Sequence, residues 1–185
     1  MKREVSRHVL HDATVVKIRS LNPRDATKAV AYIAEMYASS PYMSAYSDEW
    51  TTSEREEVLF IKNAEESSSR LLLGAFVKGE LVALGDFSEI SRRERLKHRA
   101  ITSLSVAPSF QGRGLGTLMM SVLIEQAPSA GYEQLELEVV EHNKRAIHLY
   151  EKLGFQHYGK LERGMKNRDG SYWSLLLMRR PLGLL

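Results

Sequence analysis

Three glycines alternate with other residues in the segment Gln111–Thr117 (QGRGLGT), directly before a helical pattern. Glycine allows the backbone to turn tightly and to approach a ligand closely. Main-chain N–H groups at the start of a helix carry partial positive charge, which suits a pyrophosphate. Arg113 adds a positive charge that is kept at neutral pH. The segment therefore predicts a phosphate-binding turn, with a turn that binds nothing as the alternative.

Two other nucleotide-binding motifs fit this segment less well. A P-loop requires Lys and then Ser or Thr after its second glycine, and residues 112–117 contain no lysine. A dinucleotide-binding turn reads Gly-x-Gly-x-x-Gly, but its third glycine is replaced by Thr117. That turn also belongs to a leading β-α-β unit, whereas four predicted strands precede it here.

A tyrosine and several carboxylates could supply acid–base chemistry. A tyrosine hydroxyl has a pKa near 10, so Tyr150 would remain protonated at neutral pH and could donate a proton. Glu136 and Glu138 alternate with apolar residues, which places both carboxylates on one face of a strand. A carboxylate there could accept a proton, and Glu89 is a rival for that role. The alternatives are core packing for the tyrosine, and a solvent-facing or arginine-paired position for the glutamates.

The apolar periodicity predicts the elements that would hold these residues. Their order predicts an α/β (α+β) fold in which a mixed, mostly antiparallel sheet of about six or seven strands is flanked by about four helices. Residues 1–12 show no period and predict a flexible arm before a single domain at 13–185. Asp25 and Ser53 are the expected helix caps, and Ser53 forms a capping box with Glu56. The predicted strands are 14–21, 71–77, 81–90, 100–106, 135–140, 155–163 and 172–179, and the predicted helices are about 26–37, 54–66, 115–127 and 144–153.

The composition excludes several classes of protein. The sequence of 185 residues contains no cysteine, which excludes disulfides, cysteine-ligated zinc and a cysteine nucleophile. The histidines lack ligand spacing, so we expect no metal. The net charge of +3 and the mixed basic run at 92–99 do not indicate nucleic-acid binding. No signal peptide or membrane-spanning run is present, and we expect a cytoplasmic protein.

A second motif follows the glycine turn. Ser105–Pro108 (SVAP) precedes the turn, and Leu137–Val139 (LEV), Asn143 and the run Ala146–Phe155 (AIHLYEKLGF) come about thirty residues later. In order and spacing these segments resemble the two hallmark motifs of the GNAT superfamily of N-acetyltransferases. The resemblance covers residues 101–155, and the chain's ending at 169–178 is similar to that of many small bacterial members.

The resemblance implies a single-domain GNAT-like fold that transfers an acetyl group from acetyl-CoA to an amine by direct attack in a ternary complex. The main chain of Leu104 and Val106 would pair with the pantetheine arm, Tyr150 would be the acid near the sulfur, and Glu138 would be the base. The residues implied to bind acetyl-CoA are Leu104, Ser105, Val106, Gln111, Gly112, Arg113, Gly114, Leu115, Gly116, Thr117, Asn143 and Tyr150.

The acceptor remains open at this point. A small amine, an amino acid or an aminoglycoside-like molecule fits the resemblance, and so does a protein N-terminus or lysine. A non-catalytic acyl-CoA-binding sensor is the alternative from another class. The loop 39–52, rich in aromatic and acidic residues, would border the acceptor site, so its closure would separate small from protein acceptors. The acyl chain length and the oligomeric state, a homodimer included, are not fixed by the sequence.

Overall fold

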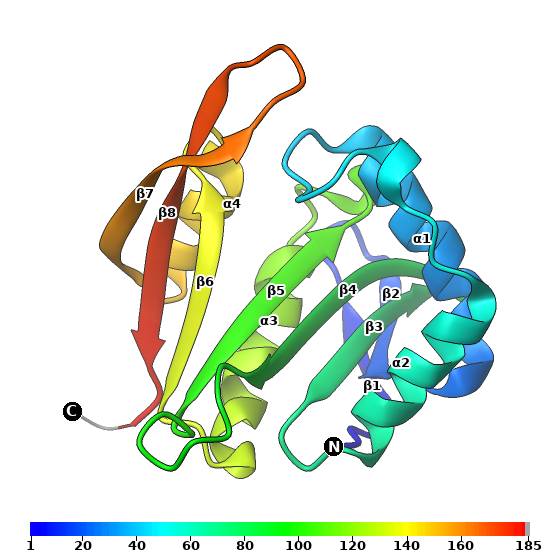
Figure 1. Cartoon of the computed structure of the whole chain (residues 1–185). Coiled ribbons are helices and arrows are strands. Elements are labelled where there is room, and N and C mark those ends of the chain that lie inside the picture. Colours follow the sequence, from blue (N-terminus) through cyan, green and yellow to red (C-terminus); the bar gives the residue numbers. More distant parts are fainter. Residues whose placement is uncertain (184–185) are drawn as a thin grey trace.

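The computed structural model describes residues 1–183 and shows an eight-stranded sheet with helices on both faces (Figure 1). The strand order is β1-β2-β3-β4-β5-β6-β8-β7, and every neighbouring pair is antiparallel except β5 and β6. The predicted fold class is therefore confirmed, with eight strands in place of six or seven. The strands are β1 Ser6–Val9, β2 Val15–Ser20, β3 Leu71–Val77, β4 Glu80–Glu89, β5 Arg99–Val106, β6 Gln134–Val140, β7 Gln156–Lys166 and β8 Tyr172–Pro181. The helices are α1 Ala26–Ser39, α2 Glu54–Glu66, α3 Leu115–Gln126 and α4 Lys144–Lys152.

The N-terminal segment differs from its prediction. We expected a flexible arm over residues 1–12, but Ser6–Val9 form β1 and pair with β2. Side chains along β1 are only alternately half-buried and exposed, so the strand has no buried apolar face to create a period. Main-chain hydrogen bonds to the sheet edge hold it instead, and such bonds leave no signature in the residue types.

The two predicted helix caps have different outcomes. Ser53 and Glu56 form the predicted capping box at the start of α2. Asp25 precedes α1, but its side chain makes no capping bond to the helix. Its carboxylate instead binds the Arg19 guanidinium, at 2.6 and 2.8 Å, and accepts the Asn22 N–H at 2.9 Å. A buried carboxylate gains more from a bidentate arginine than from one helix amide.

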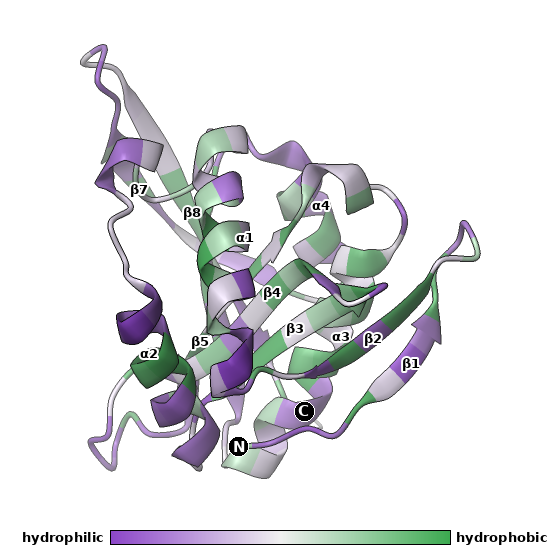
Figure 2. Cartoon of the chain, turned by 90° about the vertical axis from the view of Figure 1, so that its right-hand side faces the viewer, coloured by the Kyte–Doolittle hydropathy of each residue, from purple (hydrophilic) through white to green (hydrophobic). Residues whose placement is uncertain are grey.

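Two hydrophobic cores lie on the two faces of the sheet. On one face α3 and α4 pack against the strands through residues such as Met119, Leu123 and Ile147. On the other face α1 and α2 contribute Tyr32 and Ile61. Figure 2 shows hydrophobic residues along β3 and β4 between these layers and hydrophilic residues at the outer tips of the chain.

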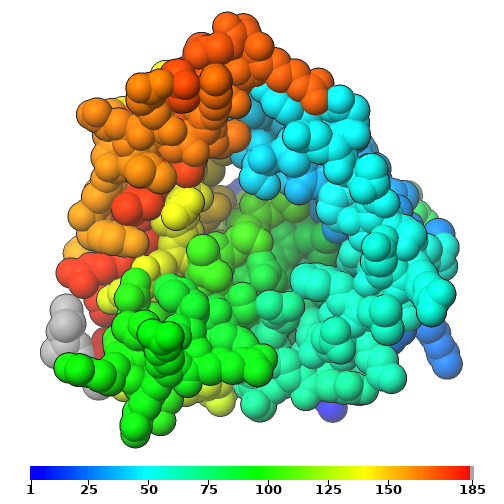
Figure 3. All heavy atoms as spheres, in the orientation of Figure 1, coloured from blue at the N-terminus to red at the C-terminus, as the bar shows by residue number. Residues whose placement is uncertain are grey.

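The sheet opens into a fork between β5 and β6. These two strands pair over only three residues, Arg99–Ile101 with Gln134–Glu136, and then diverge (Figure 1). Residues 102–106 of β5 consequently have no strand partner on the side of β6. Figure 3 shows the surface hollowed in this region, between the orange β7–β8 hairpin, the cyan loop after α1 and the green strands. We call the gap between residues 102–106 and β6 the fork, and the hollow on the face of α1 and α2 the groove.

Candidate active site

The main chain of β5 presents free groups to the fork. Ile90 donates its N–H to the carbonyl of Arg99, and Ala107 donates its N–H to the carbonyl of Val82. Main-chain groups alternate in direction along an antiparallel strand, so the odd-numbered residues of β5 point toward β4. The main-chain groups of Leu104 and Val106 therefore point into the fork. Among residues 1–183, the Val106 carbonyl alone of these groups has a hydrogen-bond partner, Gln111 Nε2 at 3.0 Å.

The glycine turn leads from the end of β5 into α3. Gly112 has a φ of 79° and Gly114, the N-cap of α3, has a φ of 88°, values that favour glycine over residues with a Cβ. A Cβ on Gly116 would lie 2.8 Å from Leu149 Cδ1 of α4 and 3.7 Å from Val106 Cγ2. The first turn of α3, with its unpaired N–H groups, is thus held close to the free edge of β5.

Polar contacts from distant segments fix the shape of the turn. Arg113 forms an ion pair with Asp12 at 2.7 Å, and Arg145 of α4 donates to Gln111 Oε1 at 3.0 Å. The His11 ring would lie 3.0 Å from a Cβ on Gly114. The β1–β2 connection therefore buttresses the turn, a role that sequence reasoning missed because nothing local to residues 11 and 12 signals it.

Tyr150 lies on α4, the helix predicted for it, and the residue is 8% exposed. The Tyr150 ring packs edge to face against the Phe155 ring, with the two ring centroids 5.7 Å apart. Burial raises the pKa of Tyr150 to about 12, so the hydroxyl is protonated at any physiological pH. Among residues 1–183 no hydrogen-bond partner of this hydroxyl is found.

The other predicted cosubstrate contacts divide between side chains and main chain. Asn143 caps α4, its Oδ1 accepting the Ala146 N–H at 3.2 Å. Leu115 is buried, so it could contact a ligand only through its main chain. The Ser105 hydroxyl accepts a hydrogen bond from Tyr32 Oη at 3.0 Å, and Thr117 is half-buried in the first turn of α3.

Glu136 and Glu138 lie on one face of β6, as predicted. That face is the groove face, but the environments of the two carboxylates differ. Glu136 is 6% exposed and binds Arg99 through two hydrogen bonds, one of them 2.7 Å long. Burial raises its pKa, but the bonds from Arg99 and from Gln134 outweigh burial and hold the pKa below its ordinary value. Glu136 is therefore engaged at the base of the fork, whereas Glu138 is exposed beside the divergent part of β6.

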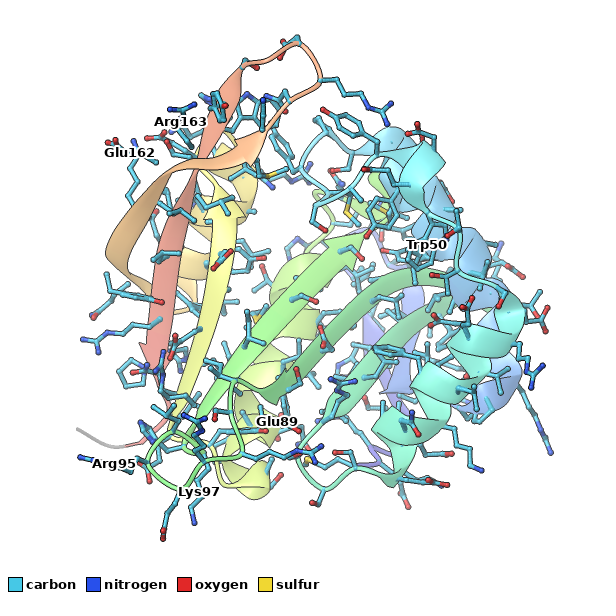
Figure 4. All side chains as sticks on the ribbon, in the orientation of Figure 1. Trp50, Glu89, Arg95, Lys97, Glu162 and Arg163 are labelled. Atoms are coloured by element: carbon cyan, nitrogen blue, oxygen red, sulfur yellow. The ribbon has the colours of Figure 1, made fainter. Side chains whose placement is uncertain are left out.

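Glu89 is far from the fork. Figure 4 places it beside the 91–98 loop, near Lys97 and at the opposite end of β5 from the glycine turn. Ser69 donates to its carboxylate at 2.8 Å and Arg92 at 3.1 Å, and its own main chain and these bonds lower its pKa. The geometry gives Glu89 no part in the site.

A carboxylate that the sequence analysis did not select lies on the floor of the groove. Asp86 of β4 is half-buried and accepts a hydrogen bond from the Ser103 hydroxyl of β5. Burial raises the pKa of Asp86, and this exceeds the opposing effects of Ser103 and of the Arg70 charge. A signal exists in the sequence, because Asp86 is the single charged residue in the strand segment 81–88.

The loop after α1 closes over the groove by contacting the β7–β8 turn. The main-chain N–H of Arg168 donates to Tyr46 Oη at 2.9 Å, and its guanidinium binds both oxygens of Asp48 at 2.7 Å. Tyr42 Oη donates to the carbonyl of His142 at 3.4 Å, and the Tyr42 ring packs against the Trp173 ring with their centroids 6.1 Å apart. We call this bridge of residues 42–48 to residues 142–173 the roof.

The sequence of the chain matches the profile of the Acetyltransferase (GNAT) family over residues 30–155, which is more than half of its length. The chain belongs to the GNAT acetyltransferase family. The crystal structure of a GNAT-family acetyltransferase from Streptococcus pneumoniae superposes on this chain with a TM-score of 0.86 at 27% identity. The superposition covers 90% of this chain and 99% of that one.

Relatives in the GNAT family act on different acceptors. A ribosomal-protein alanine N-acetyltransferase of Salmonella typhimurium is 42% identical over 60 residues, 32% of this chain and 40% of that enzyme. A phosphinothricin acetyltransferase from Sinorhizobium meliloti, solved in complex with acetyl-CoA, is 20% identical with a TM-score of 0.79, covering 91% of this chain and 89% of that one. The chain spans less than half the length of several curated relatives that it matches. Their names alone therefore do not identify the acceptor.

The residues of this GNAT protein fit acetyl-CoA. The fork offers an extended strand edge, and the glycine turn at its end offers main-chain N–H groups to a diphosphate. Within residues 1–183, no three His, Asp or Glu side chains are grouped as metal ligands. No helix in the same range is long and apolar enough to cross a membrane.

Proposed function

We propose that this protein is an N-acetyltransferase that transfers the acetyl group of acetyl-CoA to the primary amine of a small molecule. One observation carries the proposal: the unpaired edge of β5 leads directly into the positively polarised start of α3. The pantetheine arm would pair with Leu104 and Val106 as an added strand, and the diphosphate would bind the turn at Gly112–Gly116. Family membership and the acetyl-CoA bound to the Sinorhizobium meliloti neighbour support the same ligand.

The reaction would join the amine nitrogen to the acetyl carbon while the thiolate leaves. The sequence has no cysteine to carry an acyl group, which supports direct attack in a ternary complex. A main-chain N–H at Leu104 or Val106 would stabilise the charge on the carbonyl oxygen. Burial raises the pKa of Tyr150 to about 12, so its hydroxyl would hold the proton that the thiolate takes. Glu138 stays our sequence-based prediction for the base.

The contacts of the roof favour a small-molecule acceptor over a protein acceptor. Asp48 and Tyr46 are tied to Arg168 of the β7–β8 turn, and Tyr42 is tied to the strand end at His142. An extended peptide would have to displace these contacts to reach the fork from this side. An amine of a few atoms could enter through the open part of the groove, which Figure 3 shows below the roof.

Release of coenzyme A thiol from acetyl-CoA, measured over a panel of polyamines, amino acids, aminoglycosides and lysine peptides, tests the proposal. We expect turnover with one class of small amine and little with the peptides. Tyr150→Phe should bind acetyl-CoA normally by calorimetry but lower kcat by about tenfold or more. Binding of acetyl-CoA without turnover on any amine would instead identify a sensor, and faster turnover with the peptides would refute the small acceptor.

A further inference from the structure

Asp86 and Ser103 form a pair that the proposed reaction has not used. They are cross-strand neighbours in the β4–β5 ladder, and the Ser103 hydroxyl donates to Asp86 Oδ1. Ser103 is exposed to the groove, while the carboxylate behind it is half-buried. Ser103 thus connects the solvent-accessible groove with a sheltered carboxylate.

The pair lies where the fork opens. The last rung between β5 and β6 is Ile101 with Glu136, and Ser103 is two residues further along β5. Ser103 also directly precedes Leu104, whose main chain points into the fork. Ser105 lies on the same face, and its hydroxyl accepts a hydrogen bond from Tyr32 Oη of α1 at 3.0 Å. An amine that reaches a thioester at Leu104 from the groove would therefore approach beside the hydroxyls of Ser103 and Ser105.

We propose that Ser103 and Asp86 form the relay that removes the proton from the attacking amine, with Asp86 as the final acceptor in place of Glu138. This inference rests on the proposed function. As the nitrogen bonds to the acetyl carbon, its surplus proton passes to Ser103 Oγ and the serine's own proton passes to Asp86 Oδ1. The electron pair of the broken carbon–sulfur bond leaves with the thiolate, which takes its proton from Tyr150.

The surroundings of Asp86 suit a base. When a neutral amine bonds to the acetyl carbon, its nitrogen carries a surplus proton that must leave before the amide forms, so an acceptor for that proton is needed. A base works best when its pKa approaches the working pH, and burial moves the pKa of Asp86 in that direction. Arg70, which directly precedes β3, opposes the shift. The other titratable groups on this face include Tyr32 of α1, the buried Glu57 of α2, Glu138 and the Arg99–Glu136 pair. Glu138 is exposed and has no hydrogen-bond partner among residues 1–183, so nothing orients it.

Steady-state kinetics between pH 5 and 9, with acetyl-CoA and the best amine both saturating, distinguish the two carboxylates. In the wild type, kcat should rise as Asp86 ionises, and in Asp86→Asn this rise should vanish and kcat should fall about 100-fold or more. Ser103→Ala should retain the rise at a kcat about tenfold lower, because water can replace a hydroxyl in a relay. Glu125→Gln, an exposed carboxylate on α3, is the matched control and should behave as the wild type.

Calorimetry with acetyl-CoA and thermal unfolding show whether the variants are folded. Because burial raises the pKa of Asp86 in the fold, the stability that its protonated form contributes is lost as the pH rises through the folded pKa. The Tm of Asp86→Asn minus the Tm of the wild type should therefore increase as the pH is raised from 4 to 8. If the wild type is active and Asp86→Asn keeps the wild-type dependence of kcat on pH, the relay is refuted but the proposed function is not. The same holds if Glu138→Gln, rather than Asp86→Asn, loses the rise of kcat with pH. No turnover by the wild type on any amine overturns the proposed function as well.

Discussion

Replacement of Gly114 by alanine should weaken acetyl-CoA binding through the backbone alone. Gly114 has a φ of 88°, and a side chain in the left-handed region costs roughly 1–2 kcal/mol. Its Cβ would also lie 3.0 Å from the His11 ring. The substituted turn can relieve this strain only by rotating the N–H groups at the start of α3. Since about 1.4 kcal/mol corresponds to a factor of ten, we expect the Kd for acetyl-CoA to rise about 5- to 30-fold.

Gly131 provides a matched control for this substitution. Its φ is 83°, no atom lies within 4 Å of the position that a Cβ would take, and it follows α3 at the end distant from the turn. Gly131→Ala should lower the free energy of unfolding but leave the Kd unchanged. Calorimetric titration and urea unfolding of both variants test this. Unaltered binding in Gly114→Ala, or equal weakening in both, would refute a phosphate-binding role for the turn.

Two further substitutions test the framework of the site by urea unfolding. Glu136→Gln should lower the free energy of unfolding by about 2 kcal/mol at pH 7, because it removes a charged partner from Arg99 at a nearly buried position. The lowered pKa of Glu136 means that its contribution is present above the ordinary carboxyl pKa and is lost as the pH falls, so the deficit should shrink in acid; a constant deficit contradicts this. Tyr132→Phe should cost about 1 kcal/mol by removing the 2.6 Å bond from its hydroxyl to the Ser69 carbonyl, and unchanged stability would show that bond to be unimportant.

The elements that build the turn could be predicted because their signals are local. The capping box at Ser53 and the glycines before α3 each act over a few residues, and both are in the predicted places. The alternation of apolar residues likewise placed Glu136 and Glu138 on one face of β6. Predictions of this kind succeed because helix and strand periods are fixed by backbone geometry.

The contacts that complete the site could not be predicted, because they join segments far apart in the sequence. Asp12 meets Arg113 across 101 positions, and Arg168 meets Asp48 across 120. The sequence shows the charges but not which of several arginines each acid will meet. The same limit explains Glu136, whose strand position was predicted while its burial against Arg99 was left as one of two alternatives.

The features proposed for catalysis all work against stability, and this explains the contacts around them. An unpaired strand edge, left-handed glycines and a carboxylate with a raised pKa each raise the free energy of the folded chain. Only three residue pairs join β5 to β6, so the fork would widen without other links. The Arg99–Glu136 pair fixes its closed end, and the roof from Asp48 to Arg168 spans its open end. These two ion pairs therefore add links at the two ends of the fork to the packing of α3 and α4 beneath it, although neither pair would touch the substrate.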